Sequence, residues 1–207
     1  MIDKKIIKII SFFITLAVSL LPFNFILGSK AAWFSCSSMA VPALGYQYSL
    51  LYVILYILTK GLFSFTTPFL FFLHRLPLFF ATLSFKSRHW TTYILLPFLM
   101  MILFSIHPIG QQVFYYAWYW IIPMVIYVTK NDTIYTRALA SSFITHSLGS
   151  VIWLYFGCVS VTMWSALIPV VIVERLVIAG GMILFTYLFE AINALVFKKI
   201  TQKVFVS

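Results

Sequence analysis

Three long stretches of the sequence, residues 9–29, 31–59 and 138–173, contain no acidic side chain, no lysine and no arginine. A transmembrane helix needs roughly 20 consecutive apolar residues, so each stretch is long enough to cross a bilayer. The apolar residues run continuously instead of alternating, which favours helices over the strands of a membrane barrel. We therefore expect an all-α polytopic membrane protein, because helices satisfy their own backbone hydrogen bonds in hydrocarbon.

The composition excludes the water-soluble classes of protein. Of the 207 residues, 63% are hydrophobic and 9% are charged, which leaves too little polar surface for a soluble fold. The net charge of +10 comes from basic residues scattered at the ends of apolar segments. Binding to nucleic acid requires a continuous basic stripe, so we expect no nucleic-acid partner. Residues 1–207 are expected to form one transmembrane domain in the lipid bilayer.

The basic residues also predict the topology, because lysine and arginine concentrate in the cytoplasmic segments of membrane proteins. They cluster near both termini and at Lys86 and Arg88. Placing all three clusters in the cytoplasm predicts six crossings with both termini cytoplasmic. The expected helices cover residues 6–27, one crossing within 45–85, then 91–106, 111–129, 137–155 and 163–197.

Two segments interrupt this pattern. Residues 28–45 are rich in serine and other small residues, which predicts a loop or an interfacial segment. A charged, proline-containing break begins at His74, so the part of residues 45–85 from His74 onward is expected to be interfacial or broken. The number of crossings there stays open. Cys36 and Cys158 both fall outside in this topology, and the sequence leaves open whether they form a disulfide.

Ionisable side chains inside a membrane are costly and therefore mark candidate functional sites. Glu174 and Arg175 interrupt the apolar sixth helix, and His146 lies in the fifth. At 1.5 Å per residue, Glu174 and His146 lie about 16 and 14 Å from the outer ends of their helices. If these helices pack antiparallel, the carboxylate and the imidazole meet near the bilayer midplane. Adjacent side chains on a helix point about 100° apart, so Glu174 and Arg175 are not expected to pair with each other.

Aromatic and amide side chains gather at the start of the expected fourth helix. Gln111, Tyr115, Trp118 and Tyr119 fall on one face at helical spacing. Such a face offers hydrogen bonds and flat stacking surfaces, which suit a planar organic ligand. An interfacial aromatic belt is the alternative, although Tyr119 lies about 12 Å along the helix, deeper than a typical belt.

Small hydroxyl residues recur every four positions on the first helix, at Ser11, Thr15 and Ser19. This stripe allows close helix approach and predicts either contact with a partner subunit or packing inside the bundle. Catalytic patterns are missing from the sequence: it has no HExxH, no GxSxG and no paired carboxylates at one depth. We expect no enzymatic activity, no cofactor and no metal site.

Four features occur together in residues 106–197: His107-Pro108 ahead of an aromatic helix, Arg137 at the start of the next, the segment SFITHSLGSVIW at 142–153, and Leu167-Ile168-Pro169 before the last helix. In these features the chain resembles the substrate-binding S components of energy-coupling factor (ECF) transporters, which import vitamins such as thiamine, biotin and riboflavin. The resemblance implies an S-component-like bundle of six transmembrane helices in the cell (inner) membrane of a prokaryote.

The resemblance also implies uptake of a small water-soluble, vitamin-like substrate, with a transmembrane coupling subunit and ATPase subunits as partners. The alanine-rich docking motif expected on the first helix is missing, and Ser11, Thr15 and Ser19 would substitute for it. The implied substrate-binding residues are Trp33, Gln111, Tyr115, Tyr119, His146, Ser150, Trp153, Glu174 and Arg175.

Two other hypotheses stay open. A membrane scaffold or assembly factor would use the same intramembrane polar residues for helix packing alone. An enzyme acting on lipid would need a lateral opening beside a nucleophile and a base. An importer requires His146 and Glu174 to line one outward-facing cavity, whereas a scaffold requires both to pack against neighbouring helices.

Overall fold

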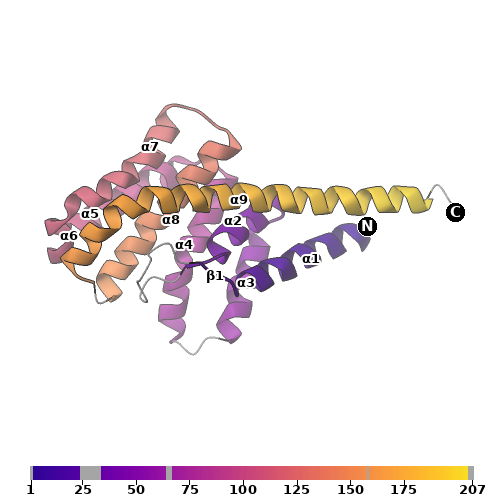
Figure 1. Ribbon diagram of the computed structural model, residues 1–207, viewed down its shortest axis with the longest axis horizontal. Coiled ribbons are helices and arrows are strands. Elements are labelled where there is room, and N and C mark those ends of the chain that lie inside the picture. The colour runs from indigo at the N-terminus through magenta and orange to yellow at the C-terminus, as the bar shows by residue number, and fades with distance from the viewer. Residues whose placement is uncertain (1, 24–33, 64–66, 158, 205–207) are drawn as a thin grey trace.

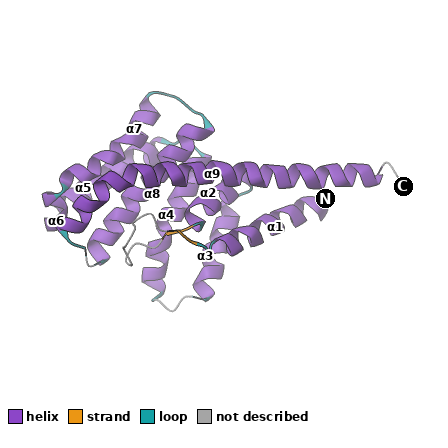
Figure 2. Cartoon of the chain, viewed as in Figure 1, coloured by secondary structure: helices purple, strands orange, loops and turns teal. Residues whose placement is uncertain are grey.

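The computed structural model describes residues 2–23, 34–63, 67–157 and 159–204. The regular structure of this part of the chain is helical apart from two short strands, β1 (Pro22–Phe23) and β2 (Phe34–Ser35), which pair antiparallel (Figure 2). The predicted all-α fold is confirmed. The disulfide left open above involves Cys158, which lies outside the described residues.

Three described helices are long and apolar enough to cross a membrane: α4 (Pro68–Lys86), α8 (Ile134–Phe156) and α9 (Val161–Val204). Shorter apolar helical segments accompany them at α3 (Leu50–Leu62), Thr91–Ile106 and Phe114–Val128. Large apolar side chains such as Leu62, Phe63 and Leu195 are exposed on the surface, as expected where lipid replaces water as the solvent. These features indicate membrane association, and six crossings remain a prediction.

The helix α2 (Ser37–Gln47) is buried inside the bundle, where it packs against α4 and α9. The expected loop or interfacial segment is therefore wrong for residues 37–45. Ala40, Val41 and Ala43 are completely buried, and small side chains let helix backbones approach closely in an apolar environment. The small residues that indicated a loop are thus packing residues of a buried helix.

The helix α4 runs unbroken from Pro68 to Lys86 and accommodates Pro77 in its interior. The expectation of an interfacial or broken segment from His74 onward is therefore wrong. Neighbouring helices can offset the one backbone hydrogen bond that a proline removes, so an intramembrane helix tolerates it. Residues 45–85 contain two helices, α3 and α4, and of these only α4 is long enough for a crossing.

The helix α1 (Ile2–Val18) is shorter than predicted, and the expected end at Leu27 lies outside the described residues. Pro22 explains the stop, because its ring would clash with the carbonyl of Val18 in a continued helix. The helix α9 is a single rod of 44 residues that extends well beyond the rest of the bundle. The first turn of α1 and the last turn of α9 lie at the same end of the molecule (Figure 1).

The expected fourth helix is divided into three pieces: α6 (Pro108–Gln112), the 3-10 helix η2 (Phe114–Trp120) and α7 (Ile121–Val128). A 3-10 helix has three residues per turn, so the face inferred from α-helical spacing is not formed. The other predicted helices are confirmed: residues 91–106 form the π-helix η1 (Thr91–Leu95) followed by α5 (Leu96–Ile106), and residues 137–155 and 163–197 lie within α8 and α9.

The start of α8 is specified by its local sequence. Thr133 and Thr136 form a capping box, in which each side chain bonds to the backbone of the other. Arg137 Nε forms an ion pair of 2.6 Å with Asp132, and its Nη1 donates to the carbonyl oxygen of Lys86 at 3.2 Å. These contacts connect the loop before α8 to the end of α4.

Candidate functional site

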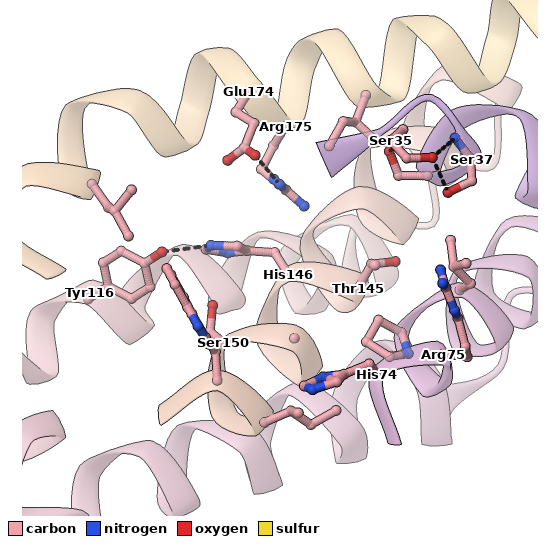
Figure 3. A pocket seen from close by; sticks show the side chains of 18 of the residues that line it. Ser35, Ser37, His74, Arg75, Tyr116, Thr145, His146, Ser150, Glu174 and Arg175 are labelled. Atoms are coloured by element: carbon pink, nitrogen blue, oxygen red, sulfur yellow. Dashed lines mark hydrogen bonds and ion pairs between the residues drawn. The ribbon is translucent and has the colours of Figure 1, made fainter. Parts of the chain in front are cut away.

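A cavity of about 530 Å³ lies between α4, η2, α8, α9 and the start of α2 (Figure 3). This volume is typical of sites that bind small organic molecules. Apolar walls are provided by Leu78, Ile152, Trp153, Trp164 and Leu167. The polar lining residues are Ser35, Ser37, Ser38, His74, Arg75, Tyr116, Thr145, His146, Ser150, Glu174 and Arg175.

The helices α8 and α9 bring the predicted polar residues together because they pack antiparallel. Trp153 of α8 contacts Trp164 near the start of α9, with ring centroids 6.0 Å apart. Farther along both helices, Ser142 Oγ donates to the carbonyl oxygen of Arg175 at 2.9 Å. This register places His146 and Glu174 on the wall of the same cavity, as the depths of the two residues predicted.

His146 is held on both ring nitrogens. Trp120 Nε1 donates to Nδ1 at 3.2 Å, and Tyr116 Oη lies 2.8 Å from Nε2. An indole nitrogen can only donate, so Nδ1 accepts and the ring proton of the neutral imidazole lies on Nε2. Nε2 therefore donates to Tyr116 Oη, and the Tyr116 hydroxyl also interacts with the side chain of Ser150, another lining residue. Tyr116 is itself a lining residue of the cavity.

Glu174 and Arg175 form an ion pair of 2.9 Å between Oε1 and Nη2, and both residues are buried. The expectation that they would not pair is wrong. Their Cβ atoms diverge, but both side chains are long enough to turn back toward each other, as Figure 3 shows. Arg175 Nη1 also donates to the carbonyl oxygen of Ser142 at 3.4 Å, which links the pair to α8.

His74 and Arg75 enter the cavity from α4 and were not predicted as site residues. The guanidinium carbon of Arg75 lies 5.3 Å from the ring centroid of Phe71, a cation–π contact one turn earlier on the helix. The signal for both residues was present in the sequence as a charged break in an apolar block. We missed it because that break was interpreted as the end of a helix.

The other predicted binding residues lie elsewhere. Gln111 and Tyr115 are exposed on α6 and η2 and do not line the cavity. Tyr119 Oη donates to the carbonyl oxygen of Ile168 at 2.9 Å, and Tyr119 does not line the cavity. Trp33 lies outside the described residues. The residues predicted from the sequence that do line the cavity are His146, Ser150, Trp153, Glu174 and Arg175.

The hydroxyl stripe of α1 faces the interior of the chain. Ser11, Thr15 and Ser19 are all buried, and Ser11 Oγ lies 2.9 Å from Tyr48 Oη in the segment between α2 and α3. Thr15 donates to the Ser11 carbonyl at 2.8 Å. This placement favours packing inside the bundle, the second of the two interpretations of the stripe.

Comparison with known proteins identifies no relative. No family model matches the chain, and neither a curated protein nor a solved structure is significantly similar to it. Within the described part of the chain, no three histidine, cysteine or acidic side chains lie together as metal ligands would. The function of the protein is therefore inferred from the cavity and the residues that line it.

Proposed function

We propose that this protein binds a small water-soluble nutrient in the cavity and is the substrate-binding subunit of an ECF-type importer. The observation that supports this function best is the convergence of His146, Glu174 and Arg175 on one cavity of about 530 Å³. Polar side chains around an open space inside an apolar bundle are costly unless a ligand or water satisfies them. A protein that only packs helices has no need of such a space.

The lining suits a water-soluble molecule with a flat or apolar part. Trp153 and Trp164 provide aromatic surface, while serine, threonine and tyrosine hydroxyls provide hydrogen bonds from three sides. Sites for small ligands combine mainly apolar walls with a few well-placed polar groups in this way.

Import would require partners, because the sequence contains no phosphate-binding loop for ATP. In the proposed assembly, ATPase subunits and a transmembrane coupling subunit supply the energy, and the chain crosses the cell (inner) membrane six times with both termini cytoplasmic. Since Ser11, Thr15 and Ser19 are covered by the chain itself, the coupling subunit would bind to another face.

A membrane scaffold or assembly factor is the second candidate. Two observations favour it: the Glu174–Arg175 pair is closed within the chain, and both nitrogens of His146 have partners. Glu174, Arg175 and His146 therefore each have a partner within the chain. A scaffold would bind no small molecule in the cavity, which separates the two candidates experimentally.

Gly149 offers a direct test, because it lines the cavity and a Cβ there would contact only Pro77 Cγ, at 3.9 Å. Gly149→Leu should therefore place a side chain in the cavity and narrow it. Gly180 is the matched control, since it also lies inside a long helix and a Cβ there would meet nothing within 4 Å.

Native mass spectrometry of the purified protein should detect a co-purifying small molecule on the wild type and on Gly180→Leu. The fraction of Gly149→Leu carrying that molecule should be lower by about tenfold or more. If the three proteins carry equal amounts, the molecule binds elsewhere. If none carries a small molecule and no vitamin shifts the unfolding temperature of the wild type, the importer proposal fails and the scaffold is favoured.

A further inference from the structure

The charges around the cavity do not balance. Arg75, Arg175 and Glu174 line it, and Glu174 is already paired with Arg175 at 2.9 Å. Within the described part of the chain, no carboxylate forms an ion pair with Arg75, and Asp132 is engaged by Arg137. The cavity therefore carries an excess positive charge in surroundings of low polarity, where the attraction for an anion is strong.

Arg75 is well placed to hold an anionic group. It is only partly buried, and its guanidinium lies against the ring of Phe71, which limits the positions the side chain can adopt. A guanidinium presents a planar fork of donors that matches a carboxylate or a phosphate. Figure 3 shows Arg75 on the same side of the view as Ser35 and Ser37, whose hydroxyls also line the cavity.

A second donor, the hydroxyl of Tyr116, lies on the opposite side from Arg75 in Figure 3. Trp120 donates to His146, which donates to Tyr116, and the Tyr116 hydroxyl interacts with Ser150, so the directed chain of hydrogen bonds ends at two hydroxyls that line the cavity. Because His146 occupies an acceptor site on the Tyr116 oxygen, the hydroxyl protons of Tyr116 and Ser150 are the donors that this end of the cavity offers to a ligand. The ligand atom nearest Tyr116 should be an acceptor.

We infer that the cavity takes a small organic anion whose carboxylate or phosphate group binds Arg75 and whose far end accepts a hydrogen bond from Tyr116. This inference rests on the proposed function, since it names the class of substrate for that same cavity. It goes further because a neutral or cationic nutrient would leave the charge of Arg75 uncompensated.

The test uses full-length protein in detergent and pairs of probes that differ in one charged group. The carboxylate pairs are nicotinate with nicotinamide and pantothenate with panthenol, and the phosphate pair is riboflavin 5′-phosphate with riboflavin. Affinities are measured by calorimetry for the wild type, Arg75→Gln, Arg75→Lys and Tyr116→Phe. Lys130→Gln is the control, because it removes one positive charge from an exposed turn outside the cavity.

In at least one pair the wild type should bind the anion more tightly than its neutral partner, by about tenfold or more. Arg75→Gln should abolish that preference, Arg75→Lys should retain part of it, and Lys130→Gln should retain all of it. Tyr116→Phe should weaken both members of the pair by a similar factor. Preference in a carboxylate pair or in the phosphate pair identifies which anionic group is recognised.

Three results would overturn the inference. These are equal binding within every pair, tighter binding of the neutral members, and a preference that survives in Arg75→Gln. A neutral co-purifying molecule in native mass spectrometry would also overturn it while leaving the proposed function intact. The absence of any bound molecule or probe would instead remove the proposed function, and the anion inference with it.

Discussion

Arg175 Nη2 lies 2.9 Å from Oε1 of Glu174, its neighbour in the sequence, and the resulting ion pair is buried between α8 and α9. Two adjacent residues of one helix thus form an ion pair with each other. The pair uses one of the four acidic residues that the chain contains. It also means that the two charges depend on each other for their stability inside the bundle.

Removing one member of this pair should destabilise the protein strongly. Glu174→Gln leaves the Arg175 charge without its carboxylate, and breaking a buried ion pair in this way costs about 3–5 kcal/mol. The double variant Glu174→Leu/Arg175→Met should recover most of that loss, because it removes both charges. The measurement is unfolding in mixed micelles followed by circular dichroism. Equal stability of Glu174→Gln and wild type would show that the carboxylate is not charged in the folded protein.

The tautomer of His146 is a second prediction. Donation from Trp120 to Nδ1 places the ring proton on Nε2, where Tyr116 accepts it. Nitrogen-15 shifts of selectively labelled histidine at pH 7 should therefore show a protonated Nε2 and an unprotonated Nδ1 in the wild type. In Trp120→Phe the donor to Nδ1 is lost, so both tautomers should be populated. A wild-type ring protonated at Nδ1 would contradict the proposed donor chain to Tyr116.

Gly181 should be essential for the packing of α9 against α2, whereas Gly180 should not. A Cβ at Gly181 would overlap the side chain of Met39, while a Cβ at Gly180 meets nothing within 4 Å. Gly181→Leu is expected to cost about 1–3 kcal/mol through overpacking. Gly180→Leu should be neutral or stabilising, since leucine is the better helix former. The two variants change helix propensity equally, so their difference in unfolding free energy isolates the contact with Met39.

The ion pair at the start of α8 should make stability depend on pH. Hydrogen bonding from Arg137 holds the pKa of Asp132 below its ordinary value of 3.8. A lower pKa in the folded state means that the stabilisation is complete above pH 3.8 and is lost as the pH falls through the folded-state pKa. The pair is partly exposed, so the loss should be about 0.2–1 kcal/mol.

Asp132→Asn is the control for this prediction. The variant should be less stable than wild type at neutral pH, and the difference should shrink as the pH falls below 3.8. Unfolding curves between pH 3 and 7 measure it. A constant difference across this range would show that Asp132 stabilises the protein by something other than its charge.

The sequence predicted the long elements of the fold well and the irregular ones poorly. The apolar runs and the charged ends located both ends of α8 and the start of α9 to within three residues, because length and hydropathy decide such helices, whereas α9 continues to Val204, beyond its predicted end at residue 197. The prediction of a loop was wrong for residues 37–45, since small residues are frequent both in loops and in close helix contacts, and only the surrounding helices decide between these outcomes. The sequence pattern could not distinguish the 3-10 helix η2 from an α-helix, because the two differ by less than one residue per turn.

The residues of the candidate site were likewise predicted only in part. His146 and Glu174 were predicted to meet because their depths could be counted along two helices joined by a short connection. Arg75 comes from α4, whose position relative to α8 depends on packing that no local pattern encodes. Tyr116 was replaced in the prediction by Tyr115 and Tyr119, since an α-helical face was assumed where the chain forms a 3-10 helix.

The length of α9 has a mechanical consequence. The helix continues for 30 residues beyond Glu174, which corresponds to about 45 Å, and the proline inside it, Pro169, lies on the other side of Glu174. The hydrocarbon of a bilayer is only about 30 Å thick, so this part of the helix alone is longer than one crossing requires. A force applied at its tip would be transmitted as an angular displacement to Glu174 and Arg175.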